Sequence, residues 1–137
     1  QKVYTRFSKL GYKFATVIAD SALISDYATL DQGAQVMNNV VINIGSKIGE
    51  NSIINTSVSV DHDCVIGAHC HLAPGTKLSG EVKVENNVHI ATGANIINGI
   101  NIGTGSIISV GANVTKSIAP YSIAYGTRAA IKGLNQL

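Results

Sequence analysis

The feature that most constrains this chain is an aliphatic residue at every sixth position over most of its length. From Ile18 to Val114, all seventeen of these positions hold Val, Ile or Leu, without a gap or an insertion. The fourth residue after each of them is small or β-branched, as a narrow interior requires. The third residue after each is Gly or Asn in ten of seventeen cases, and these residues tolerate the positive φ of a tight turn. The period therefore predicts a short strand and a tight turn in every six residues.

A strand of this length cannot bury a face alone, but stacked repeats can. The pattern resembles the hexapeptide-repeat β-helix, in which three hexads form one triangular coil, and its left-handed winding is implied by that resemblance. Seventeen hexads make five to six coils, so residues eighteen apart are expected to stack about 4.8 Å apart. We expect an all-β, left-handed parallel β-helix with a short N-terminal helix and a C-terminal cap.

With 137 residues the chain is expected to form one domain, flanked by two short segments. Residues 1–13 carry four apolar side chains on one helical face and are expected to be a remnant or linker helix of a missing N-terminal domain, placed to cover the open first coil. The four are Val3, Tyr4, Phe7 and Leu10. Residues 14–119 form the β-helix. Residues 120–137 form a capping tail, because Pro120 cannot donate to a strand ladder and is expected to end the repeat.

Composition and charge limit the kinds of molecule that the chain is expected to bind. The net charge of +2 is too small to indicate nucleic-acid binding. No apolar run approaches the length of a bilayer span, and no signal peptide opens the chain, so neither a membrane nor export is expected. Cys64 and Cys70 occupy successive inward positions on different faces, which predicts core thiols rather than a disulfide.

Polar residues interrupt the repeat near its middle, and His62 is the most informative of them. It follows an inward position by two residues, so its ring is expected to point outward near a corner. Imidazole is the natural general base at neutral pH, and Asp63 or Asp61 would fix its tautomer and raise its basicity. Gly80, eighteen residues later, would place a backbone N–H beside the ring, where it could hold an oxyanion. From the spacing alone, the interpretations of His62 as a solvent-exposed turn histidine and of Gly80 as an ordinary turn glycine remain open.

Two further histidines are expected on another part of the surface. His71 and His89 are eighteen residues apart and should stack on one outer edge, with Asn55 near the same corner. His62 lies one corner further round. A site that uses all four residues is therefore expected in a cleft between two neighbouring subunits.

The central segment resembles the sialic acid O-acetyltransferases and the bacillosamine-type sugar N-acetyltransferases. The similar residues are Asn55-Thr56, Val60 to Gly67, His71 to Gly75 and Leu78 to Gly80, within a resemblance that runs from Phe14 to about Gly126. Those enzymes are homotrimers that acetylate sugars or nucleotide-linked amino sugars from acetyl-CoA without a metal. The resemblance implies the same fold, co-substrate and assembly here.

The resemblance also implies a role for each matching residue. His62 would be the general base, Asp63 its partner, and the Gly80 N–H the oxyanion donor. His71 would contact the acetyl group or thioester, and Asn55 the sugar. The wall that contacts acetyl-CoA, mostly through backbone, falls at Ala91, Thr92, Val110 and Gly111.

The chain departs from the family pattern in two places. Family members usually begin with a nucleotide-sugar-binding βαβ domain, which these 137 residues do not contain. The closing Gly-x-Pro-Ala motif reads Gly126-Thr127-Arg128-Ala129.

We expect transfer of acetyl to an amino group of a nucleotide-linked sugar, in bacterial surface-glycan biosynthesis and in the cytoplasm, where acetyl-CoA is found. Three alternatives remain. The first is O-acetylation of sialic acid or a related sugar hydroxyl. The second is a γ-type carbonic anhydrase, which has the same fold but needs a zinc ion on three histidines with a spacing that His62, His69, His71 and His89 do not match. The third is a non-catalytic trimeric scaffold, which would have no need of His62, His71 and Asn55 together.

Overall fold

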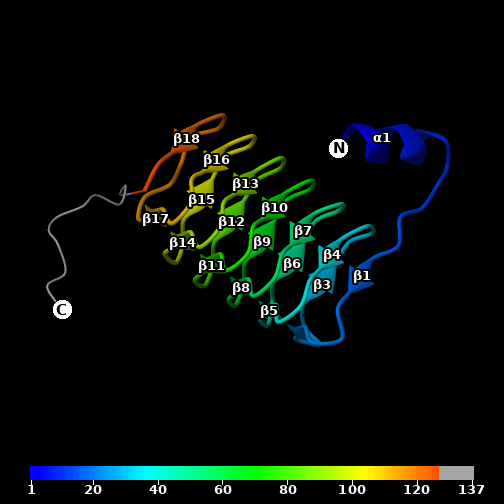
Figure 1. Cartoon of the computed structure of the whole chain (residues 1–137), viewed down its shortest axis with the longest axis horizontal. Coiled ribbons are helices and arrows are strands. Elements are labelled where there is room, and N and C mark those ends of the chain that lie inside the picture. The colour runs from blue at the N-terminus through cyan, green and yellow to red at the C-terminus, as the bar shows by residue number, and fades with distance from the viewer. Residues whose placement is uncertain (127–137) are drawn as a thin grey trace, which may run out of the picture.

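The computed structural model describes residues 1–126, and these form a parallel β-helix whose three sides are sheets of two-residue strands (Figure 1). Successive strands belong to successive sheets, so each coil places one strand on each side of a triangular prism. Eighteen strands at three per coil give six coils, in agreement with the count of hexads.

The strands of each side are as follows. Sheet A holds β1 (Val17–Ile18), β4 (Gln35–Val36), β7 (Ile53–Ile54), β10 (His71–Leu72), β13 (His89–Ile90), β16 (Ile107–Ile108) and β18 (Ile123–Ala124). Sheet B holds β2 (Leu23–Ile24), β5 (Val41–Ile42), β8 (Ser59–Val60), β11 (Lys77–Leu78), β14 (Asn95–Ile96) and β17 (Asn113–Val114). Sheet C holds β3 (Thr29–Leu30), β6 (Lys47–Ile48), β9 (Val65–Ile66), β12 (Lys83–Val84) and β15 (Asn101–Ile102).

The strands pair in parallel, and every pair except β16 with β18 has the predicted register of eighteen residues. Leu72, for example, pairs with Ile54 on one side and with Ile90 on the other. The turns stack in the same way and form three corners. We call them the AB corner (turns such as 55–57), the BC corner (such as 61–63) and the CA corner (such as 67–69), after the sheets that each one joins.

The interior is the aliphatic column that the sequence predicts. The second residue of each strand points inward, and from Val36 to Val114 none of these side chains is more than 5% exposed. Buried hydroxyls at the fourth position donate hydrogen bonds to the next coil, as Ser46 does to the Asp61 carbonyl at 2.7 Å and Ser52 to the Gly67 carbonyl at 2.8 Å. Small polar residues can therefore occupy this narrow core without losing hydrogen bonds.

The corners have the backbone conformation that the glycine and asparagine positions predict. All fourteen turn positions from Gly33 to Gly111 have positive φ. Ten of them are Gly or Asn. The other four, Ser57, Asp63, His69 and Glu81, adopt the left-handed conformation without that advantage.

The N-terminal helix α1 (Lys2–Lys9) forms where expected, but its contacts differ from the prediction. Only Tyr4 is buried, whereas Val3 and Leu10 are each 65% exposed. Tyr4 stacks on Phe14, with ring centroids 4.3 Å apart, and donates a hydrogen bond to Glu50 at 3.0 Å. Tyr4 thus anchors the helix at the CA corner.

The helix does not cover the first coil. The inward residue Ile18 is 49% exposed, whereas none of the inward residues from Val36 to Val114 is more than 5% exposed. In Figure 1, α1 lies beside the prism rather than across its end. The prediction that this helix covers the open coil is therefore wrong.

Around Pro120 the register shifts from eighteen residues to sixteen, and one more short strand follows. Ile118 bridges to Ile102 in sheet C, and β18 then pairs with β16 in sheet A. Ile123 pairs with Ile107, a step of sixteen residues instead of eighteen, so the last coil is closed by a shorter turn. Pro120 itself packs against Gly103. Of the motif at 126–129, only Gly126 lies among the described residues.

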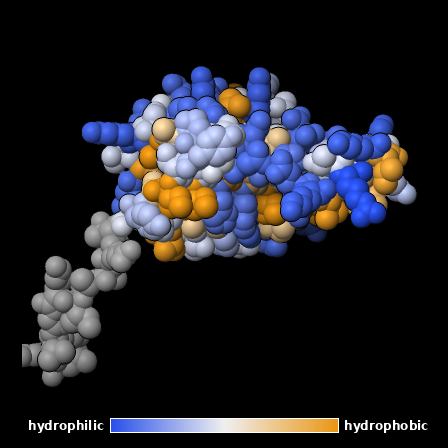
Figure 2. Space-filling view, turned by 90° about the horizontal axis from the view of Figure 1, so that it is seen from above, coloured by the Kyte–Doolittle hydropathy of each residue, from blue (hydrophilic) through white to orange (hydrophobic). Residues whose placement is uncertain are grey.

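The surface is largely polar. Figure 2 shows one face on which hydrophobic residues form small separate patches among hydrophilic ones. No helix within residues 1–126 has the length and apolar character needed to cross a bilayer.

Candidate active site

His62 and Asp63 lie at the BC corner, in the turn that follows β8. Their side chains are 49% and 62% exposed, so the ring points outward, as predicted. His62 Nδ1 lies 3.0 Å from Asp63 Oδ2. A carboxylate can only accept this hydrogen bond, so Nδ1 carries the proton and Nε2 presents its lone pair. The hydrogen bond with Asp63 is the main reason that the pKa of His62 is raised above its ordinary value.

Gly80 lies one coil above this ring, as the register requires. A Cβ added to Gly80 would overlap His62 Nε2 and would lie 2.5 Å from Cε1, so the ring lies directly on the glycine. The Gly80 N–H has no hydrogen-bond acceptor among residues 1–126. A free lone pair and a free N–H donor therefore lie side by side at this corner.

The turn that carries His62 is held from both sides. The His62 N–H donates to Asp61 Oδ1 at 2.8 Å, and the same oxygen accepts a hydrogen bond from Asn43 Nδ2 at 2.9 Å. These donors lower the pKa of Asp61, with Asn43 the larger cause. From the coil above, the Glu81 N–H donates to the His62 carbonyl at 2.9 Å. Sequence reasoning missed Asn43, although its position eighteen residues before Asp61 would have identified it.

His71 and His89 lie on the outer face of sheet A, with ring centroids 5.0 Å apart. Asn55 Oδ1 accepts the Thr56 N–H at 2.8 Å, so its Nδ2 group is the one that faces His71 Nε2, at 3.2 Å. Nε2 is therefore an acceptor, and the neutral ring carries its proton on Nδ1. Burial, and then the charge of His89, lower the pKa of His71.

The residues predicted to contact acetyl-CoA lie at the AB corner, above Asn55. The N–H groups of Ala91 and Gly111 are used within the β-helix, donating to the carbonyls of Ile108 and Thr92. Those of Thr92 and Val110 have no acceptor among residues 1–126, and both residues are exposed. Two free backbone donors are thus available at this corner.

The predicted site residues form two groups within one chain. His62, Asp63 and Gly80 lie at the BC corner, whereas Asn55 and His71 lie at or near the AB corner, on the other side of sheet B. The positions of these residues within their hexads predict this separation.

Neither cysteine is placed to act as a nucleophile. Both are buried, and their thiols donate to backbone carbonyls, Cys64 to Ser79 at 3.2 Å and Cys70 to Glu85 at 3.0 Å. Burial raises the pKa of both thiols. Both are free thiols of the core, as predicted.

The histidines of the zinc alternative are not arranged as a ligand set. His69 lies at the CA corner, only 13% exposed, with Nδ1 held by Asn51 at 2.9 Å. His71 is held by Asn55 on another face. Among residues 1–126 no three His, Cys, Asp or Glu side chains converge on one point.

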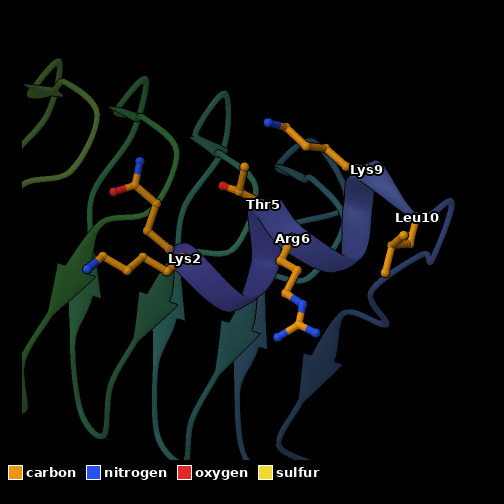
Figure 3. A pocket seen from close by; sticks show the side chains of 6 residues that line it. Lys2, Thr5, Arg6, Lys9 and Leu10 are labelled. Atoms are coloured by element: carbon orange, nitrogen blue, oxygen red, sulfur yellow. The ribbon is translucent and has the colours of Figure 1, made fainter.

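The hollow along α1 is separate from all of these groups. It has a volume of about 620 Å³ and is lined by Gln1, Lys2, Thr5, Arg6, Lys9 and Leu10 (Figure 3). All of these residues come from the helix and its two ends, and none is an imidazole or a carboxylate. This groove therefore adds no catalytic group to the site.

Residues 45–80 match the family described as Bacterial transferase hexapeptide (six repeats). This stretch carries the repeat of the hexapeptide-repeat transferases. Among curated relatives, the acyl-[acyl-carrier-protein]–UDP-N-acetylglucosamine O-acyltransferase of Helicobacter pylori is 31% identical over 88% of this chain and 43% of its own length. The chain thus spans less than half the length of the curated relatives it matches.

Solved structures resemble the chain over more of its length. A mutant of perosamine N-acetyltransferase from Caulobacter crescentus, in complex with CoA and GDP-perosamine, has a TM-score of 0.91 and 38% identity, covering 97% of this chain and 63% of that one. The acetyltransferase domain of PglB from Neisseria gonorrhoeae, in complex with acetyl coenzyme A, has a TM-score of 0.89 and 31% identity, covering 91% and 61%. These neighbours are acetyltransferases with the same β-helix.

Proposed function

We propose that this chain is the catalytic β-helix of an acetyl-CoA-dependent transferase that acetylates an amino group of a nucleotide-linked sugar. The observation that carries the proposal is the contact of the His62 ring with Gly80. It places a basic nitrogen and an unpaired N–H within reach of one reacting carbonyl. The similarity to an N-acetyltransferase bound to CoA and GDP-perosamine supports both the co-substrate and the class of acceptor.

The reaction follows from the two groups at the BC corner. His62 Nε2 accepts a proton from the sugar amine as the nitrogen attacks the thioester carbonyl. The Gly80 N–H donates to the oxygen that becomes negative, and this stabilises the tetrahedral intermediate. The carbon–sulfur bond then breaks, and the proton passes from His62 to the CoA sulfur. The products are the acetamido sugar and CoA, and no acyl-enzyme is required.

Asp63 and His71 support this step in different ways. The Asp63 carboxylate keeps the proton on His62 Nδ1 and stabilises the imidazolium that forms. His71, neutral and with its proton on Nδ1, supplies a donor for the acetyl oxygen or thioester. Thr92 and Val110 offer free N–H groups to the amide carbonyls of the coenzyme.

The two corners act together in a homotrimer. In that assembly, His62 and Gly80 of one subunit face the AB corner and sheet A of its neighbour, so that the site is completed between chains. We further propose that the reaction takes place in the cytoplasm, where acetyl-CoA is available, and serves surface-glycan synthesis.

A second function, O-acylation of a sugar hydroxyl, is favoured by the curated relatives, which are O-acyltransferases. The same imidazole can deprotonate a hydroxyl. Two solved UDP-N-acetylglucosamine acyltransferases, at 17% and 21% identity, share only the fold. The 38% identity to a perosamine N-acetyltransferase favours N-acetylation.

The experiment that tests the proposal is acetyl-CoA turnover against a panel of nucleotide-linked amino sugars, sialic acids and UDP-N-acetylglucosamine. We expect CoA release only with amino sugars, at a rate that His62→Ala reduces. Release with the hydroxyl acceptors alone would establish the second function. Calorimetry that detects no binding of acetyl-CoA would favour the scaffold alternative.

A further inference from the structure

We propose that the turn at residues 43–45, one coil below His62, positions the catalytic pair, and that Gly45 is needed to leave the space in which the Asp63 carboxylate meets the His62 ring. The kinetic consequence of this inference rests on the proposed function. The contact itself exists in the free protein and can be tested there.

Asp63 lies eighteen residues after Gly45, so the two residues stack at the BC corner. A Cβ added to Gly45 would overlap Asp63 Oδ1 and would lie 3.2 Å from its Cγ. The other carboxylate oxygen, Oδ2, is the one that meets His62 Nδ1 at 3.0 Å. A side chain at position 45 would therefore compete for the volume of the carboxylate, which would have to rotate away from the ring.

The same turn also fixes the residue on the other side of His62. Asn43 donates to Asp61 Oδ1, which in turn accepts the His62 N–H. The Asp63 N–H donates to the Ile44 carbonyl at 2.9 Å. The residues on both sides of His62, Asp61 and Asp63, are thus hydrogen-bonded to the coil below.

A second glycine at the BC corner, Gly99, shows that Gly45 does more than allow a left-handed turn. Gly45 and Gly99 occupy equivalent turn positions, with φ of +74° and +68°. A Cβ on Gly99 would meet nothing within 4 Å, whereas one on Gly45 would meet Asp63. The two positions carry the same backbone requirement, and only Gly45 adds the contact with the carboxylate.

Three carboxylates face His62: Asp61 and Asp63 from its own turn and Glu81 from the turn above. The hydrogen bond to Asp63 has the largest influence on the ring. Rotation of Asp63 would remove that bond and leave the other two charges in place. The loss should therefore appear as a fall in the pKa of His62, without loss of the fold.

The test compares Gly45→Ala with Gly99→Ala in the full chain. The pKa of His62 is measured by NMR titration of the imidazole nitrogens, alongside kcat and KM for acetyl-CoA. We expect the pKa of His62 to fall in Gly45→Ala and to stay unchanged in Gly99→Ala. We expect kcat to fall about 10- to 100-fold in the first variant with KM unchanged, since the base is misplaced while the coenzyme wall is intact.

A second variant guards against misfolding. Asn occupies the same left-handed turn position at Asn39, Asn51 and Asn87, so Gly45→Asn should fold while still adding a Cβ. It should lower the pKa of His62 in the same way. An unchanged pKa in a folded position-45 variant, or an equal fall in Gly99→Ala, would overturn the proposal. If the wild-type chain transfers no acetyl group, the proposed function fails, but the titration still decides the positioning role.

Discussion

The BC corner and the outer face of sheet A each present an imidazole, and the surroundings shift the pKa values of the two rings in opposite directions. At the corner, the Asp63 carboxylate raises the pKa of a half-exposed His62. On sheet A, burial and the charge of His89 lower the pKa of His71. The first ring is suited to accept a proton during a reaction. The second is kept neutral and is suited to donate one hydrogen bond without changing charge.

The difference comes from where each histidine falls within its hexad. A strand residue such as His71 points straight out of the sheet and meets residues eighteen away, here His89. A turn residue such as His62 can bend sideways and meet its own neighbour in sequence. Residues eighteen apart stack both on the sheets and at the corners, but a turn also lets a side chain meet its neighbour in sequence, as His62 meets Asp63.

The largest expected effect comes from removing the corner imidazole. His62→Ala should reduce kcat by about 10²- to 10⁴-fold, the range for loss of a general base. Asn98→Ala is the matched control, because Asn98 holds the same exposed turn position two coils above. Both variants should keep the wild-type oligomeric state by size-exclusion chromatography. Near-normal turnover by His62→Ala would mean that the corner is not the reaction centre.

Gly80→Ala should have the next largest effect, because it disturbs the base and the donor together. The new methyl group would overlap His62 Nε2 and displace the ring. We expect a loss of about 10²-fold in kcat, comparable to the loss of one oxyanion donor. Steady-state kinetics and a crystal structure of the variant would measure both parts. A displaced ring with full activity would show that the alignment of His62 over Gly80 is irrelevant to catalysis.

Much of this fold was predictable because the sequence repeats one six-residue pattern with an aliphatic residue at a fixed position. The unbroken aliphatic column from Ile18 to Val114 determined the register, the core and the stacking of His62 under Gly80. The register alone also separated His62 from His71. These features depend on spacing, which a sequence shows directly.

What could not be predicted depends on which atoms meet. The six-residue period does not show that the last coil is closed in sixteen residues, or that Tyr4 is the only buried residue of α1. The spacing alone left both Asp61 and Asp63 open as the partner of His62. Only the resemblance implied Asp63, whose Oδ2 lies 3.0 Å from His62 Nδ1 in the structure. The space left by Gly45 became visible only when the carboxylate was placed above it.

A pH profile sharpens the comparison between the two imidazoles. Because His62 must be unprotonated to act, kcat/KM should rise with pH and reach half its maximum above about 6.5, the ordinary value for histidine. In NMR titrations of the free protein, His71 should lose its proton at a lower pH than His62. Asp63→Asn should move the rise in kcat/KM to lower pH. A wild-type profile centred at or below the ordinary pKa would show that Asp63 does not control the base.

The smallest expected effect tests how the corner is attached to the coil below. Asn43→Ala removes one hydrogen bond to Asp61 and should lower the free energy of unfolding at pH 7 by about 1 kcal/mol. The pKa of Asp61 is lowered in the folded state, so the contribution is present above the unfolded value of about 3.9 and is lost as the pH falls through the lower folded value. The difference in Tm between Asn43→Ala and the wild type should therefore shrink from pH 7 to pH 3. Asn98→Ala, which removes no such bond, should show no pH-dependent difference. A constant difference for Asn43→Ala would mean that its side chain supports the turn through packing rather than through the charge on Asp61.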